Sequence, residues 1–157
     1  MCGIVGYIGQ RDCTDVLMDG LEKLEYRGYD SAGIAVFEKT GIKTVKTKGK
    51  LKDMREKLVK EGSPVGHCGI GHTRWATHGE PSDLNSHPHS NGRVTIVHNG
   101  IIENYIELKE FLTEKGYTFK SQTDSEIIAC LLDYYYSERN PLRAITETVK
   151  ELRGSYA

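Results

Sequence analysis

The chain has little of what marks the special classes of protein. No apolar run approaches the roughly 18 residues of a membrane-spanning helix, and the N-terminus lacks the basic start and apolar stretch of a secretory signal. The 21 Lys and Arg nearly balance the 22 Asp and Glu, so charge gives no case for binding nucleic acid or an anionic membrane. The four cysteines are few and unpatterned for a disulfide framework, so we expect reduced thiols and a cytoplasmic location.

The most informative residue is Cys2, which directly follows Met1. A small residue at position 2 permits removal of Met1, which leaves Cys2 with both a thiol and a free α-amine. An α-amine titrates near ~7.7–8.0 and a thiol near ~8.5, so the amine can accept the proton of the thiol. Nucleophile and base on one residue form the N-terminal variant of an activated nucleophile. The alternative is a second-position cysteine without a role.

Apolar spacing predicts an α+β chain of one domain, long enough at 157 residues to bury a core. We expect strands over 3–8, 32–37, 42–48, 68–73 and 93–98. Helices are expected over 13–24 and from about 51, 104, 123 and 140, with a last strand starting at 155. Hairpins favour antiparallel sheets. The loop over 74–92 has no periodicity, and a loop of that length in a compact domain is typically functional.

Hydrolysis of an amide through a thioester needs donors for the oxyanion as well as a nucleophile. Asn99 and Gly100 follow a predicted strand and could supply a side-chain amide and a backbone N–H. Asn-Gly is also the commonest hairpin signal. The residues that follow lead into a helix and not into a returning strand, so both interpretations stay open.

Two charged residues could bind the α-groups of an amino acid. Arg74 ends a strand where its planar guanidinium could hold a carboxylate bidentately, and Asp124 lies at a helix start, where it could also face an ammonium. The alternatives are a surface ion pair for Arg74 and a helix cap for Asp124.

Other conspicuous side chains have plainer interpretations. Several metal-ligating residues fall within 23 positions but match no CxxC, HExxH or Cys₂His₂ pattern, so we expect no metal: His67, Cys68, His72, His78, His87 and His89. We expect Cys13, Cys68 and Cys130 to be small buried apolar residues. The run 134–136 of three tyrosines is predicted to pack a helix.

Five motifs occur here in the order in which they occur in the class II glutamine amidotransferases, which this chain resembles from Cys2 to Ala157. They are Met1-Cys2-Gly3-Ile4-Val5-Gly6, Tyr26-Arg27-Gly28-Tyr29-Asp30-Ser31-Ala32-Gly33, Gly71-His72-Thr73-Arg74-Trp75-Ala76-Thr77-His78-Gly79, Asn99-Gly100-Ile101-Ile102-Glu103-Asn104-Tyr105 and Thr123-Asp124-Ser125-Glu126. The segment from Arg74 to Gly79 favours the hexosamine branch over the asparagine synthetases and the purine-pathway enzymes.

The resemblance implies an N-terminal-nucleophile hydrolase fold, a four-layer αββα sandwich of two antiparallel sheets between helices. It implies that Cys2 is the catalytic nucleophile and that Asn99 and Gly100 form the oxyanion hole. The remaining roles carried by the resemblance are substrate binding by Arg74, Thr77, His78 and Asp124, support of the nucleophile by Arg27, ammonia gating by Trp75, and a place in the mobile lid for His87.

The implied function is hydrolysis of L-glutamine, with ammonia channelled in the full enzyme to fructose-6-phosphate, giving glucosamine-6-phosphate. The resemblance implies no cofactor, and as partners a synthase domain and a second copy in a homodimer. We expect residues 1–157 to be a glutaminase domain cut before its C-terminal strands, with the synthase and isomerase domains absent. Three alternatives remain: another class II amidotransferase, an inactive fragment that binds other molecules, and an N-terminal cysteine hydrolase of other amides.

Overall fold

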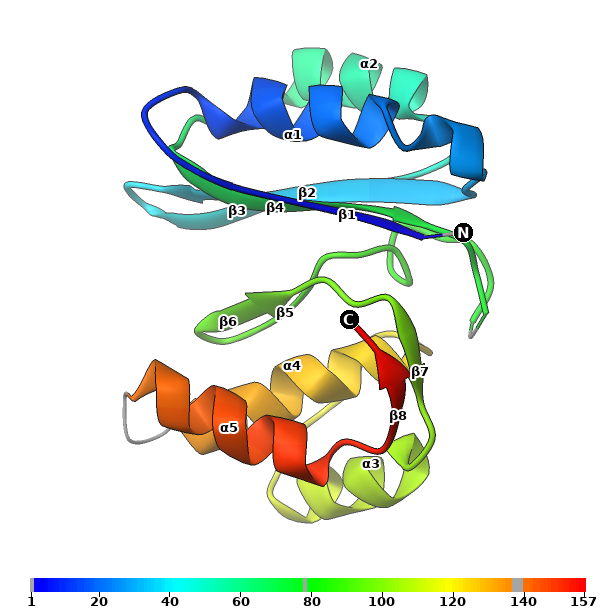
Figure 1. Ribbon diagram of the computed structural model, residues 1–157, viewed down its shortest axis with the longest axis vertical. Coiled ribbons are helices and arrows are strands. Elements are labelled where there is room, and N and C mark those ends of the chain that lie inside the picture. The colour runs from blue at the N-terminus through cyan, green and yellow to red at the C-terminus, as the bar shows by residue number, and fades with distance from the viewer. Residues whose placement is uncertain (1, 78, 137–139) are drawn as a thin grey trace. The chain divides into compact units, whose positions relative to one another are not determined.

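Residues 2–77, 79–136 and 140–157 are described by a computed structural model, in which the chain divides into units Met1–Pro88 and His89–Ala157. The first unit contains one antiparallel sheet in the order β1-β4-β2-β3 (Figure 1). Its strands are β1 (Gly3–Ile8), β2 (Ser31–Glu38), β3 (Gly41–Lys48) and β4 (Cys68–Arg74). Gly3 lies opposite Thr73, and Ser31 lies opposite Arg74. The starts of β1 and β2 therefore meet the end of β4 at one end of the sheet.

Two helices, α1 (Cys13–Glu22) and α2 (Leu51–Glu61), cover one face of this sheet (Figure 1). Asp12 caps α1, and Leu17 and Leu21, one helical turn apart, are fully buried against the sheet. The predicted helix over 13–24 ends earlier than expected. Leu24 donates its N–H to the carbonyl oxygen of Leu21 at 2.9 Å and leads into the short 3₁₀ helix η1 (Glu25–Arg27).

The other face of the sheet carries the long loop. A Cβ atom on Gly33 would lie 2.0 Å from the carbonyl oxygen of His87, so the loop packs directly against β2 at this glycine. The predicted burial of Cys68 is wrong. Gly69 faces Leu17 and Cys13 on the helix side, so its neighbour Cys68 points to the opposite face at the start of β4, where it is exposed.

The second unit packs three helices, α3 (Tyr105–Glu114), α4 (Asp124–Tyr135) and α5 (Pro141–Glu151), around a core that includes Leu112, Ile127 and Leu131. The strand predicted over 93–98 is shorter than expected, and a second strand, which the sequence did not predict, follows it. Val94–Ile96 is β6, which pairs with β5 (His89–Asn91), whereas β7 (Gly100–Ile102) pairs with β8 (Gly154–Tyr156) (Figure 1). Because β6 and β7 belong to different sheets, the hairpin interpretation of Asn99-Gly100 is wrong.

Side chains begin two of these helices as the sequence predicts. Thr123 caps α4 by accepting from the N–H of Glu126, and Asn140 caps α5 with Pro141 in its first turn. The capping box of α4 is incomplete, because the Glu126 carboxylate accepts from the N–H groups of Lys120 and Ser121 instead. None of the helices in the described part of the chain has the length and apolar character needed to cross a membrane.

Candidate active site

Cys2 is held at the end of the sheet, beside the residue that follows β4. The N–H of Trp75 donates to Cys2 Sγ at 3.3 Å, and the thiol points to the carbonyl oxygen of Trp75 at 3.7 Å. The antiparallel register produces this contact, since Gly3 pairs with Thr73 two residues before Trp75. Cys2 is half-buried, and its sulfur is held by contacts with the backbone of Trp75.

Arg74 is the last residue of β4 and is almost completely buried, with 3% of its surface exposed. Its Nη2 atom donates to the carbonyl oxygen of Gly79 at 3.3 Å. A guanidinium is buried only where polar groups surround it, because removing it from water is costly. The alternative of a surface ion pair is therefore wrong, and Arg74 provides a buried cation one residue before the backbone that contacts Cys2.

The segment over 26–31 supports this corner of the sheet. The N–H of Asp30 donates to the carbonyl oxygen of Arg74 at 2.8 Å. The side-chain carboxylate of Asp30 accepts from the N–H of Ala76. Gly28, at φ 76°, lies against the Trp75 ring. Tyr29 anchors the segment in the core: its hydroxyl accepts from the N–H of Leu51 at 2.8 Å, and burial raises its pKa to about 12. Arg27, half-buried in η1, belongs to this supporting segment.

The other residues predicted in the long loop differ in exposure. His87 is buried, and its ring stacks on His72 with 4.1 Å between the ring centroids. Trp75 and Thr77 are exposed, the former with 54% of its surface. His78 lies outside the described residues. The lid role of His87 and the gating role of Trp75 stay predictions.

The second unit holds the candidate oxyanion donors at the start of β7. Asn99 exchanges two backbone hydrogen bonds with Ala157, at 2.9 and 2.7 Å. Gly100 has φ 135°, and a Cβ atom there would lie 2.1 Å from the carbonyl oxygen of Ser155. Only glycine fits this position, because the backbone torsion and the close approach of β8 both exclude a side chain. The pairing with β8 thus gives Gly100 a structural requirement in addition to its predicted role.

Asp124 is the first residue of α4 and is 4% exposed. Its carboxylate does not cap the helix, since that role belongs to Thr123. Instead, Oδ2 accepts from the N–H of Ile102 at 2.9 Å, and Oδ1 accepts from the hydroxyl of Ser125 at 3.4 Å. Asp124 therefore links the start of α4 to β7, the strand that begins with Gly100.

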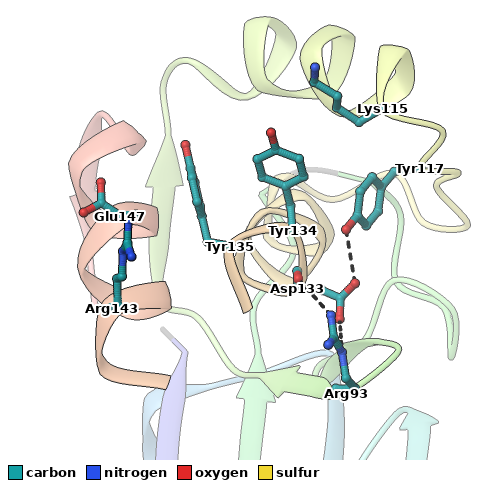
Figure 2. A pocket seen from close by; sticks show the side chains of 8 residues that line it. All are labelled: Arg93, Lys115, Tyr117, Asp133, Tyr134, Tyr135, Arg143 and Glu147. Atoms are coloured by element: carbon teal, nitrogen blue, oxygen red, sulfur yellow. Dashed lines mark hydrogen bonds and ion pairs between the residues drawn. The ribbon is translucent and has the colours of Figure 1, made fainter. Parts of the chain in front are cut away.

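A separate cavity of about 580 Å³ opens in the second unit, at the ends of α3 and α4 and the beginning of α5 (Figure 2). Arg93, whose guanidinium pairs with Asp133 at 3.2 Å, contributes to its wall. Among the predicted site residues that the structure describes, none lines this cavity. Tyr134 meets Phe111 edge to face at 5.4 Å, so the predicted packing role of the tyrosine run is confirmed for this ring. No group of three metal-ligating side chains was found among the described residues.

Three residues with a part in these arrangements were not singled out from the sequence: Asp30, His98 and Ser125. Asp30 and Ser125 each lie within one of the five motifs, which is the signal that the sequence offers for them. His98 directly precedes Asn99, and Ser125 directly follows Asp124. Their contacts join residues far apart in the chain, so local spacing could not reveal them.

A family model described as a glutamine amidotransferase domain matches residues 72–157, more than half of the chain. The chain therefore belongs to the glutamine amidotransferase domain family.

Among curated relatives, the glutamine–fructose-6-phosphate aminotransferase (isomerizing) of Clostridium tetani is 58% identical over 159 residues, covering 100% of this chain and 26% of the relative. Proteins of the same name from Thermus thermophilus and Vibrio parahaemolyticus are 56% and 49% identical, over 100% and 99% of this chain and 26% of each relative. The chain thus spans about a quarter of the length of these relatives.

Two solved structures are similar over 100% of this chain and 34% of their own chains, each at 25% identity. Glutamine phosphoribosylpyrophosphate amidotransferase from B. subtilis gives a TM-score of 0.80, and a structure described as the allosteric regulatory enzyme of purine biosynthesis gives 0.85. These likenesses confirm the predicted α+β fold of the N-terminal-nucleophile amidotransferases.

Proposed function

We propose that the chain hydrolyses L-glutamine to glutamate and ammonia through a glutamyl thioester on Cys2. The observation that carries this proposal is the position of Cys2 Sγ, 3.3 Å from the backbone nitrogen of Trp75, the residue next in sequence to the buried cation of Arg74. Membership of the amidotransferase domain family supports it.

The reaction divides into two steps. Removal of Met1 frees the α-amine of Cys2, which takes the proton of the thiol. The thiolate attacks the side-chain amide carbon of glutamine, the C–N bond breaks, and the nitrogen leaves as ammonia with the proton returned by the α-amine. Water activated by the same amine then attacks the thioester, which releases glutamate and restores the thiol.

Each remaining residue has a proposed part. Arg74 binds the α-carboxylate of glutamine with Thr77 and His78 beside it, and Asp124 binds the α-ammonium. The side-chain amide of Asn99 and the N–H of Gly100 donate to the oxyanion of the tetrahedral intermediate. Arg27, with the rest of its segment, supports the nucleophile, and His87 belongs to the cover of bound glutamine.

The wider role follows the relatives' name. Since they are glutamine–fructose-6-phosphate aminotransferases, we propose that the ammonia serves to convert fructose-6-phosphate to glucosamine-6-phosphate. That reaction needs a synthase domain, toward which Trp75 would gate the ammonia, and we propose a homodimer in the cytoplasm as its setting.

The test combines intact mass with labelling of Cys2 by a diazoketone analogue of glutamine. We expect the protein without Met1 to hydrolyse glutamine and to take up one label, and the protein that retains Met1 to lose activity by roughly 10²–10⁴-fold. Cys2→Ala should abolish both activity and labelling. Cys68→Ala, which removes the other accessible thiol, is the matched control and should change neither. Full activity from a preparation whose mass includes Met1 would refute the mechanism.

A further inference from the structure

In the second unit, buried hydrogen bonds join Asp124 to two side chains, Ser125 and His98, that have no part in the chemistry described so far. His98 Nδ1 lies 2.8 Å from Ser125 Oγ, and that hydroxyl lies 3.4 Å from Asp124 Oδ1. His98, Ser125 and Asp124 are 5%, 2% and 4% exposed, so water does not compete for these contacts. Buried polar chains of this kind are costly unless each member is paired, so this one requires an explanation.

The directions of the hydrogen bonds follow from the number of protons. Ser125 has one hydroxyl proton, and it is directed to the Asp124 carboxylate. The same oxygen must therefore accept from His98, which assigns the proton of a neutral ring to Nδ1. Burial lowers the pKa of His98, against the opposing effect of the Asp124 charge, which favours that neutral ring.

The Asp124 carboxylate is consequently held at both oxygens. Oδ1 receives the Ser125 hydroxyl and Oδ2 receives the N–H of Ile102 at 2.9 Å. Two donors in different directions fix the plane of the carboxylate, which rotates freely when only one oxygen is bound. The direction in which its remaining lone pairs can accept from an ammonium is thereby set.

We propose that His98 and Ser125 are positioning residues that orient Asp124 toward the α-ammonium of glutamine. This inference rests on the proposed function, which makes Asp124 the ammonium anchor. His98 also directly precedes Asn99, so the same contacts that orient the anchor hold the end of the chain segment that carries the oxyanion donors. If these contacts only stabilised the fold, removing them would weaken the binding of glutamine and of an analogue without the amine equally.

The test compares glutamine with glutaramate, which is glutamine without its α-amine, used as a competitive inhibitor. It is carried out in the longest natural polypeptide that contains this chain. Ser125→Ala breaks the link between His98 and Asp124, so we expect KM for glutamine to rise roughly 3–10-fold. The Ki of glutaramate should stay unchanged, because that molecule has no group for Asp124 to bind. Asp124→Asn should show the same selectivity more strongly, and the double variant should lose no more than Asp124→Asn alone.

A second pair of variants separates positioning from folding. The Nδ2 atom of an asparagine can donate where the histidine Nδ1 does, so His98→Asn should keep KM within about twofold, whereas His98→Leu should match Ser125→Ala. Ser90→Ala, on the exposed β5–β6 hairpin, is the control and should change no constant.

The outcomes are distinct. The positioning role would be overturned if Ser125→Ala left KM for glutamine unchanged, or if it raised KM for glutamine and Ki for glutaramate by the same factor. Neither result would affect the selectivity expected of Asp124→Asn. If Asp124→Asn itself shows no selectivity, the ammonium anchor is wrong and this proposal fails with it. If Cys2→Ala leaves glutamine hydrolysis intact, the proposed function fails independently.

Discussion

At the scale of single residues, Arg74 combines a charge with unusually deep burial. The residue is 3% exposed, and its guanidinium donates to a backbone carbonyl at 3.3 Å. A lysine at this position would keep the charge but could not donate to two carboxylate oxygens at once, since its ammonium is a point charge and not a planar fork. We therefore expect carboxylate binding to depend on the planar shape of the guanidinium as well as on its charge.

We expect Arg74→Lys to raise KM for glutamine by an amount equivalent to about 1–3 kcal/mol, with a smaller effect on kcat. Steady-state kinetics measures both, and a thermal melt shows whether the variant is folded. Arg55→Lys is a suitable control, because Arg55 is an exposed surface residue paired with Glu22. Unchanged KM in a folded Arg74→Lys protein would remove Arg74 from the binding site.

Asn99 allows a test of transition-state stabilisation, because its backbone is held independently of its side chain. Both of its backbone groups pair with Ala157, so Asn99→Asp should leave the pairing intact while replacing an amide donor by an acceptor. Loss of one oxyanion donor typically costs about 10²–10³ in kcat. We expect that loss with little change in KM, and continued labelling of Cys2 by the diazoketone. A lower melting temperature with kcat within about threefold would indicate a structural role only.

The sequence identified these residues because their chemistry is local to short motifs. Cys2 was identifiable from its place after Met1, and Arg74 from its place at the end of a strand. The contacts of Asp30 and Ser125 could not be predicted from the sequence, because they depend on partners elsewhere, the backbone of Ala76 and the ring of His98. A carboxylate or hydroxyl in a list of residues carries no sign of which distant group it will meet.

At the scale of elements, periodicity predicted the helices and the first sheet better than the short strands. The strands β2 and β3 form a hairpin, so one apolar pattern specifies both. By contrast, β7 and β8 pair across most of the second unit, and each has three residues, too few to show a period. The predicted strand over 93–98 merged β6 with the approach to β7 for the same reason.

Close packing of the long loop on β2 gives a prediction for Gly33. A methyl group there would meet the carbonyl oxygen of His87 at 2.0 Å, so Gly33→Ala must displace the loop or the strand. Overpacking of this kind costs roughly 1–3 kcal/mol, which corresponds to several degrees in melting temperature for a chain of this size. Gly6→Ala, also within a strand, is the matched control because its Cβ would meet nothing within 4 Å. Equal melting temperatures for the two variants would contradict the packing described.

At the scale of the whole molecule, the free energy of unfolding should depend on the titration of His98. Burial lowers the pKa of this imidazole in the folded state, although the charge of Asp124 opposes the shift. In the unfolded chain the pKa returns to about 6.5. Between the lowered pKa and 6.5, the unfolded state therefore binds a proton that the folded state does not.

The free energy of unfolding should therefore fall as the pH drops below about 6.5, by at most ~1.4 kcal/mol per pH unit from this one group. Above that pH, His98 should not change the free energy of unfolding with pH. His98→Asn removes the titrating group but keeps a donor toward Ser125, so its unfolding free energy should decline less between pH 7.5 and 5.5 than that of the unaltered protein. Urea denaturation at a series of pH values measures this difference. Since other groups titrate in the same range, the comparison includes His67→Asn, which makes the same substitution at an exposed histidine. Parallel declines in all three proteins would mean that His98 titrates with the same pKa in the folded and unfolded states.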